Sequence, residues 1–343
     1  MVRAEEGIAP PRAGGPARGP RADRSERGHG GTKEREALDV PPKKTTLARA
    51  RYRGFAPYGF LSPYLIVAAV FFVVPFVNAI TLAFYETNGP KSRVFVGLDN
   101  FRFLLHDQTF HAALWNTTVY ALVSVFVQLP LAMGLALMLN KGNARLRGFF
   151  RVVFFSPNLV GQVLVGILFS VLFTPRYGLV GRASQAVLHW GYEARWLVDP
   201  KLIMPSIVIA SLWLWVGFNM VYFLAALQTV DKSLEEAARI DGANAWQVFW
   251  HVTLPSMRHV VIFVVIMSVI GSYQLFELPL TLLSESFGYG VDNSGVTLIT
   301  YLNFTAFRTG DLGLGSAVGW VVAVIIFIIS LVQIRVARVA EAD

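Results

Sequence analysis

The chain contains no cysteine, which excludes a disulfide framework, a cysteine-ligated zinc site and a thiol nucleophile. Charge is also scarce: Asp, Glu, Lys and Arg make up 15% of the 343 residues, against 54% hydrophobic residues and a mean hydropathy of +0.51. The dipeptide Gly-Lys does not occur, so the chain has no phosphate-binding loop of the G-x-x-x-x-G-K-[ST] type and is not expected to bind ATP itself. This composition excludes an ordinary water-soluble enzyme.

The hydrophobic residues are gathered in long runs. Six stretches have no Asp, Glu, Lys or Arg: 54–85, 112–140, 152–175, 202–230, 260–276 and 312–334. Crossing the hydrocarbon core of a bilayer takes about 20 helical residues at about 1.5 Å each, and only a helix satisfies its own backbone there. The fold class we predict is an all-α transmembrane bundle of six helices, a single membrane domain over 56–338 with spans at 61–84, 114–139, 152–173, 203–227, 260–282 and 314–334.

The basic excess lies mainly before the first span. Thirteen of the 30 Lys and Arg residues fall within residues 1–53, with seven Asp and Glu, so the net charge of +8 belongs largely to this segment. Residues 1–55 are rich in Pro, Gly, Arg and Ala and show no hydrophobic period. This pattern predicts a disordered basic cytoplasmic tail facing anionic lipid, and it argues against a nucleic-acid site.

Loop charges predict the orientation. The short loop after the second span holds Lys141, Arg145, Arg147 and Arg151 without an acid, and cytoplasmic loops are enriched in basic residues. Six spans then place both termini in the cytoplasm. The third loop, 174–202, competes with this orientation because it is also basic, although acids dilute it.

An alternative count makes the uncharged stretch 293–307 a seventh span. It has 15 residues, many of them Asn, Ser and Thr, which is short and polar for a crossing. We therefore expect a helix lying outside the membrane or at its surface.

One cytoplasmic loop, 231–259, has the pattern of a folded element (DKSLEEAARIDGANAWQVFWHVTLPSMRH). Residues 235–240 favour a helix with acids in its first turn, Gly242 permits a sharp turn, and a second helix is expected from about Ala245. Leu254 and Pro255 are expected to end that second helix, because proline disfavours the helical conformation in the residue before it. The hairpin would carry an apolar surface formed by Leu234, Ala238, Trp246, Phe249 and Trp250.

Such a surface on a water-facing loop indicates a protein partner. The alternative is an amphipathic helix resting on the membrane, which predicts a basic polar face. Here that face is acidic or mixed, which favours the partner.

The spacing Glu236-Ala237-Ala238, then Gly242, then Val252-Thr253-Leu254-Pro255 resembles the EAA loop of importer-type ATP-binding-cassette (ABC) permeases. The resemblance extends over about 57–338 and is to the sugar and glycerol-phosphate permease subunits of the maltose-transporter type. The stretches GLDNFRFLLHDQTFHAALWNT (97–117), FFRVVFFSPNLV (149–160), WLVDPK (196–201), WLWVGFNMVYFLAALQTV (213–230) and EEAARIDGA (235–243) follow the family's pattern.

The resemblance implies a six-helix ABC importer permease with a cytoplasmic EAA coupling helix that docks on an ATPase subunit. The residues it implies for ATPase coupling are Glu236, Ala237, Ala238, Asp241, Gly242, Leu254 and Pro255. The implied partners are a homologous second permease, two cytosolic ABC ATPase subunits that bind the ATP, an extracytoplasmic sugar-binding protein and the lipid bilayer. The implied location is a bacterial cell membrane, and no cofactor is expected in this chain.

The chain departs from the family at two places. The Gly-Gly-Pro stretch usual after the fifth span is replaced by SESFGYGVDNSG (284–295), so the outer loop there is expected to differ in shape. Where the family commonly has Ile-Pro before the EAA loop, this chain has Val230-Asp231, which leaves the helix entry capped by an acid.

A neutral polyol needs hydrogen-bonding groups beside aromatic faces, and the fourth and fifth spans supply both. The candidate substrate-binding residues are Ser211, Trp215, Phe218, Asn219, Ser268, Ser272 and Gln274. By resemblance, the family's sugar cavity is lined by the same two helices. Serines and aromatics in membrane helices also serve helix packing, which is the alternative for this set.

The function these patterns predict is that of a transmembrane subunit of an ATP-driven importer for a carbohydrate, a mono- or oligosaccharide or related polyol. The alternatives are an autonomous secondary transporter and a membrane-embedded enzyme. Scarce intramembrane charge disfavours the first, because Glu277 is the only acid well inside a predicted span. No convergent catalytic set at one depth supports the second.

Overall fold

The computed structural model describes residues 56–89, 92–141, 144–174, 177–180, 182–183 and 195–342. The chain divides into two compact units, 1–57 and 58–343, and the fold described here is that of the second unit. The predicted tail, 1–55, lies outside the described residues.

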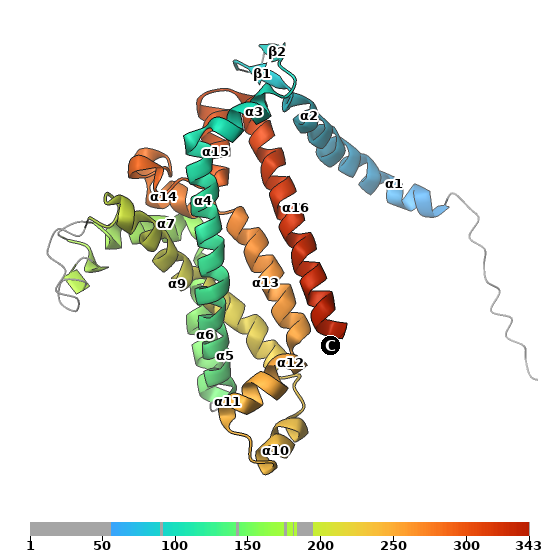
Figure 1. Cartoon of the computed structure of the whole chain (residues 1–343), viewed down its shortest axis with the longest axis vertical. Coiled ribbons are helices and arrows are strands. Elements are labelled where there is room, and N and C mark those ends of the chain that lie inside the picture. Colours follow the sequence, from blue (N-terminus) through green and yellow to red (C-terminus); the bar gives the residue numbers. More distant parts are fainter. Residues whose placement is uncertain are drawn as a thin grey trace, which may run out of the picture. The chain divides into compact units, whose positions relative to one another are not determined.

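The described part of the chain is mostly helical, as predicted, with one short β-hairpin that the all-α prediction did not include (Figure 1). Its first elements are α1 (Ala56–Ala68), π-helical η1 (Ala69–Val73), α2 (Val74–Leu82), β1 (Tyr85–Thr87), β2 (Arg93–Phe95), α3 (Asp99–His106), α4 (Gln108–Val123), π-helical η2 (Ser124–Gln128), α5 (Leu129–Lys141), α6 (Ala144–Val160), α7 (Gln162–Leu172) and α9 (Pro200–Leu227). The remaining elements are α10 (Lys232–Ile240), α11 (Ala245–Val248), π-helical η3 (Phe249–Thr253), α12 (Leu254–Ser256), α13 (Arg258–Tyr273), α14 (Glu277–Leu282), the 3-10 turns η4 (Ser284–Ser286) and η5 (Val291–Asn293), α15 (Leu298–Asn303), π-helical η6 (Phe304–Arg308) and α16 (Leu312–Ala342).

Four helices in the described part are long and apolar enough to cross a membrane: 58–82, 108–140, 200–227 and 312–336. Two bent pairs, 147–160 with 162–172 and 245–256 with 258–273, raise the number to six if each pair counts as one span. The stretch 293–307 is not one long helix: it begins at the last residue of η5, continues through non-helical residues, and then forms the short helix α15 and most of the π-helical turn η6.

The predicted third span, 152–173, is not one straight helix. It is divided between α6 and α7, which meet at an angle of 97°. Gly161 makes the bend because it lies between the two helices with φ +85°, a conformation that side chains oppose.

The predicted fifth span, 260–282, is also interrupted. Helix α13 ends at Tyr273, residues 274–276 are non-helical, and the short helix α14 follows. Helix α14 packs against α7 at Gly166, where a Cβ would lie 1.8 Å from the Thr281 hydroxyl oxygen. Glu277 is therefore the exposed first residue of a short helix and does not lie inside a continuous span.

Helix α9 is the centre of the packing. It contacts α5, α6, α7, α13 and α14, and many of its side chains are buried. At Gly217 it approaches α6 so closely that a Cβ would lie 1.7 Å from the Phe154 carbonyl oxygen. Helix α9, on which several of the predicted sugar residues lie, is thus packed directly against the backbone of α6 on one side.

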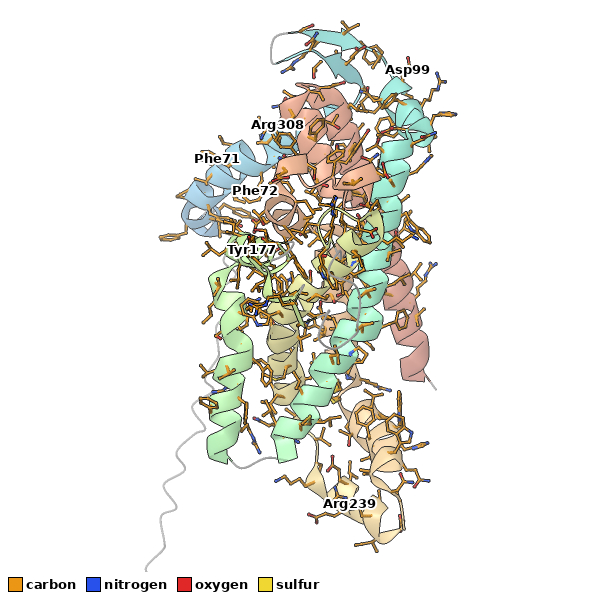
Figure 2. All side chains as sticks on the ribbon, turned by 90° about the vertical axis from the view of Figure 1, so that its left-hand side faces the viewer. Phe71, Phe72, Asp99, Tyr177, Arg239 and Arg308 are labelled. Atoms are coloured by element: carbon orange, nitrogen blue, oxygen red, sulfur yellow. The ribbon has the colours of Figure 1, made fainter. Side chains whose placement is uncertain are left out.

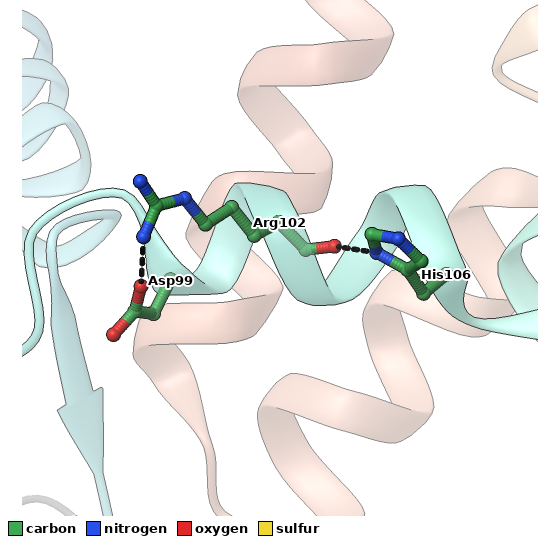
Figure 3. A network of polar contacts seen from close by, with 3 residues as sticks. All are labelled: Asp99, Arg102 and His106. Carbon is green, nitrogen blue, oxygen red and sulfur yellow. Dashed lines mark hydrogen bonds and ion pairs between the residues drawn. The ribbon is translucent and has the colours of Figure 1, made fainter.

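The bundle has two distinct ends (Figures 1 and 2). At one end lie the antiparallel hairpin β1–β2, with Glu86 opposite Val94, and helices α3 and α15. The exposed face of α3 carries a local polar network in which Arg102 binds Asp99 at 3.1 Å and His106 Nδ1 donates to the Arg102 carbonyl at 2.9 Å (Figure 3). Helices α10 and α11 lie at the opposite end, beside the ends of α5 and α6.

Candidate functional site

The first helix of the 231–259 loop begins with an acid cap, as predicted. Helix α10 starts after Asp231, whose carboxylate accepts the backbone N–H of Ser233 at 2.9 Å. Hydrogen bonds from Ser233, chiefly that of its backbone N–H, lower the pKa of Asp231. The cap satisfies one of the unpaired donors that every helix start exposes.

Gly242 ends α10 in a Schellman turn. It has φ +88°, its N–H donates to the Arg239 carbonyl at 3.1 Å, and the Ala243 N–H donates to the Ala238 carbonyl at 3.0 Å. A Cβ at this position would have no atom within 4 Å. Within this chain the glycine is therefore required by the backbone conformation alone, and the space beside it is open.

The second helix begins at Ala245, as predicted, and is fixed by a capping box that the sequence analysis did not identify. Asn244 Oδ1 accepts the N–H groups of Trp246 and Gln247, while Gln247 Oε1 accepts the Asn244 N–H at 2.8 Å. The Asn-x-x-Gln spacing before an apolar run was the available signal.

The prediction that Leu254 and Pro255 end the second helix was wrong. The chain continues through the π-helical turn η3 into α12, which ends at Ser256, and Leu254 itself is helical with φ −64° and ψ −45°. In the π-helical turn the Leu254 N–H donates to the Phe249 carbonyl. This wider turn precedes the proline and accommodates it, and the sharp bend of 77° follows between Ser256 and Arg258.

The two neighbouring acids of α10 have different surroundings. Glu235 is half-buried and its Oε1 accepts the Thr253 hydroxyl at 2.9 Å. Glu236 is exposed, and no hydrogen bond or ion pair of its side chain occurs among the described residues. Glu236, the acid of the EAA motif, is thus available to a partner, whereas Glu235 links the two helical segments of the hairpin.

The predicted apolar surface is present on the hairpin. Leu234, Trp246 and Trp250 are exposed, Ala238 and Phe249 are half-buried, and Ile240, which the sequence analysis did not include, is 86% exposed. Trp246, Phe249 and Trp250 form a ring cluster with centroids 5.4 to 6.2 Å apart. An exposed aromatic cluster of this kind is typical of a surface that a partner covers.

Two hollows adjoin the hairpin. A cleft of about 610 Å³ lies between α10–α11 and the ends of α5 and α9, and its lining includes Lys232, Glu235, Glu236 and Arg239. An apolar groove of about 450 Å³ lies on the other side of the aromatic cluster, along α5 and α13. The labelled Arg239 lies at this end of the bundle in Figure 2.

The predicted sugar residues other than Gln274 lie on α9 and α13, which pack against each other. On α9, Ser211 and Asn219 are buried, and Trp215 and Phe218 are half-buried with their rings 5.5 Å apart. The Ser211 hydroxyl is buried and makes no hydrogen bond of full geometry among the described residues, although it interacts with the side chain of Tyr120.

The two candidate serines of α13 make hydrogen bonds within the bundle. Ser268 Oγ lies 2.7 Å from the Ser124 hydroxyl of η2, and Ser272 Oγ donates to the Ser268 carbonyl at 2.7 Å. Gln274 is exposed and lies in the break after α13, outside the continuous fifth span that the sequence predicted. The packing role that the sequence left open for these serines is therefore real for Ser268, and a sugar role for the set stays a prediction.

The described part of the chain is thus a helical bundle with up to six possible membrane spans and a capped, partly apolar hairpin at one end. The chain belongs to the family described as "Binding-protein-dependent transport system inner membrane component", whose model matches residues 128–342. It is a membrane permease of a binding-protein-dependent transport system, and this family membership excludes the enzyme alternative.

Curated relatives and solved structures agree with this assignment. The chain is 34% identical to the arabinooligosaccharides transport system permease protein AraP of Bacillus subtilis (strain 168), over 82% of this chain and 88% of the relative. It is also 34% identical to the lactose transport system permease protein LacF of Rhizobium radiobacter, over 84% and 96%. A chain of a bacterial ABC transporter involved in the import of the acidic polysaccharide alginate shares the fold, with TM-score 0.71 and 23% identity over 83% of this chain and 95% of that chain.

Proposed function

We propose that the chain is the permease subunit of an ATP-driven importer that translocates an oligosaccharide. The observation that supports this most directly is its similarity, over more than four-fifths of its length, to permeases named for arabinooligosaccharides and lactose. The lack of a G-x-x-x-x-G-K-[ST] motif in the sequence supports the proposal that partner subunits bind the ATP. The proposed partners are a second permease, two cytosolic ABC ATPases and an extracytoplasmic binding protein.

In the proposed mechanism the 231–259 hairpin docks on an ATPase. Glu236 would meet a basic group of the ATPase, and the open space beside Gly242 would let the partner approach the backbone closely. Closure of the ATPases on ATP would move the hairpin, and the bundle would alternate access to a cavity at mid-depth. No covalent chemistry is required of this chain.

The proposed sugar site uses the α9 set first. Trp215 and Phe218 offer aromatic faces that are only half-buried, and the Ser211 hydroxyl, which interacts with Tyr120 but lacks a hydrogen bond of full geometry, is a hydrogen-bonding group beside them. A dehydrated polyol needs both features. Asn219, Ser272 and Gln274 complete the proposed lining, and Ser268 supports it through Ser124.

We also propose that the 231–259 hairpin and both termini face the cytoplasm. The basic residues at the adjoining ends of α5 and α6, such as Lys141 and Arg147, support this because these helix ends lie at the hairpin's end of the bundle. Reporters fused after Gly142, Ser256 and Asp343 should be cytoplasmic, and one fused near Gly290 should be external; Gly142 and Asp343 lie outside the described residues. An external reporter at Asp343 would contradict six spans.

Purification in mild detergent tests the assembly. The chain should co-purify in stable stoichiometry with a subunit that carries its own phosphate-binding loop and hydrolyses ATP. A single chain that transports sugar in liposomes without ATP would instead support the secondary-transporter alternative.

A further inference from the structure

Helix α10 is only lightly attached to the rest of the hairpin. It has no buried side chain, and most of its residues are exposed. Among the described residues, one side-chain hydrogen bond joins it to another element, that from the Thr253 hydroxyl to Glu235 Oε1 at 2.9 Å. Without this hydrogen bond, a force applied to α10 by a partner would reach the bundle through the packing of α10 against η3 and α11 and through the chain ends of the helix at Asp231 and Gly242.

Thr253, to which Glu235 of α10 is bound, is itself well packed. It is only 4% exposed and is the last residue of η3. Its carbonyl accepts the N–H of Met257, which is 2% exposed and packs in the core cluster that includes residues of α5 and α9. Directly after Met257 begins α13, the helix that carries Ser268 and Ser272. The Glu235–Thr253 hydrogen bond thus connects the exposed helix to the helix that enters the membrane bundle.

We propose that Glu235 is a positioning residue for transport, whose hydrogen bond to Thr253 makes α10 and η3–α12 move as one body when the ATPase acts. This deepens the proposed function and rests on it. Glu236 makes the contact with the ATPase, and Glu235 carries the resulting displacement into α13. Loss of Glu235 should therefore leave docking intact and reduce the sugar moved for each ATP hydrolysed.

The test uses the complete importer, with Glu235→Ala, Thr253→Val, the double variant and Glu235→Gln. Glutamine keeps a carbonyl oxygen that can accept the threonine hydroxyl, so it should restore what alanine removes. The measurements are ATPase co-purification and the ratio of radiolabelled lactose or arabinotriose, whichever the wild type takes up, to ATP hydrolysed. We expect the ratio to fall about fivefold or more in both single variants, with co-purification unchanged.

The double variant distinguishes one shared bond from two separate roles. If the two residues act through their hydrogen bond, the double variant is no worse than either single variant.

A distance measurement gives a second, structural readout. Because the chain has no cysteine, spin labels on cysteines introduced at Ser233 and Ser256 report the α10–α12 distance without interference from other labelled sites in this chain. Glu235→Ala should broaden that distance distribution, and Glu235→Gln should not.

Three results would overturn the proposal. These are an unchanged transport ratio with a narrow distance distribution, additive losses in the double variant, and losses that merely follow reduced ATPase co-purification. Failure of the proposed function itself would look different, because the wild-type chain would then neither bind an ATPase nor couple hydrolysis to uptake.

Discussion

Replacing Gly242 by valine should detach or uncouple the ATPase while leaving the membrane bundle folded. The glycine has φ +88° and closes the turn that joins α10 to α11. A β-branched side chain opposes this conformation, so the variant backbone must leave it or bear the strain.

The structure allows the conformational cost of Gly242→Val to be distinguished from its steric cost. A left-handed conformation costs a non-glycine residue about 1–2 kcal/mol if the backbone keeps it; if the backbone leaves it, the lost hydrogen bonds of Gly242 and Ala243 cost about 1 kcal/mol each instead. Within this chain a Cβ at position 242 meets no atom within 4 Å, so no clash adds to this. A cost of about 2 kcal/mol corresponds to roughly a thirtyfold smaller population of the native turn.

The assay compares Gly242→Val with Gly242→Asn, because asparagine tolerates the left-handed region while adding bulk. Co-purification of the ATPase and hydrolysis stimulated by the binding protein are measured at matched membrane abundance. Gly97→Val is the control, since Gly97 also has a positive φ and open space but lies in the turn before α3, at the other end of the bundle.

Valine at position 242 should impair both readouts, and valine at position 97 should leave co-purification normal. If asparagine at 242 behaves like valine, the ATPase itself approaches the turn closely; if asparagine is tolerated, the conformation is what matters. Normal docking and stimulation of Gly242→Val would refute the reasoning.

Further variants test other parts of the account. Glu236→Lys should weaken ATPase docking more than Glu236→Ala, because reversing a charge at an interface costs more than removing it, by about 2 kcal/mol or more in pull-down affinity. Trp215→Ala or Ser272→Leu should abolish uptake with assembly and basal ATPase activity intact; normal uptake by both would place the sugar site elsewhere. Gly217→Leu should lower the thermal stability of the purified bundle, because its Cβ would overlap the Phe154 carbonyl, and an unchanged melting temperature would contradict the close packing of α6 and α9.

The shape of the 231–259 hairpin could be predicted from the sequence because its signals are local. The acid cap at Asp231, the turn at Gly242 and the helix start at Ala245 each depend on residues a few positions apart. The different surroundings of Glu235 and Glu236 could not be predicted. They depend on Thr253, 18 positions away, which only the folded hairpin brings beside Glu235.

The breaks in the third and fifth spans were missed for a different reason. Apolar residues continue on both sides of Gly161 and of residues 274–276, and a hydrophobic run does not show where its helix bends. The pairing of Ser268 with Ser124 was missed for a similar reason. It joins helical segments far apart in the sequence, so the sequence of the fifth span alone could not show whether Ser268 serves helix packing or sugar binding.

Uptake by the reconstituted complex tests the central claim most directly. The chain, its second permease and its ATPases are placed in liposomes with ATP inside, and the binding protein is added outside with radiolabelled lactose or arabinotriose. The account predicts sugar accumulation that requires ATP hydrolysis, the binding protein and this chain together. Accumulation that proceeds without ATP, or a complete complex that hydrolyses ATP yet takes up neither sugar nor any other oligosaccharide its binding protein retains, would contradict it.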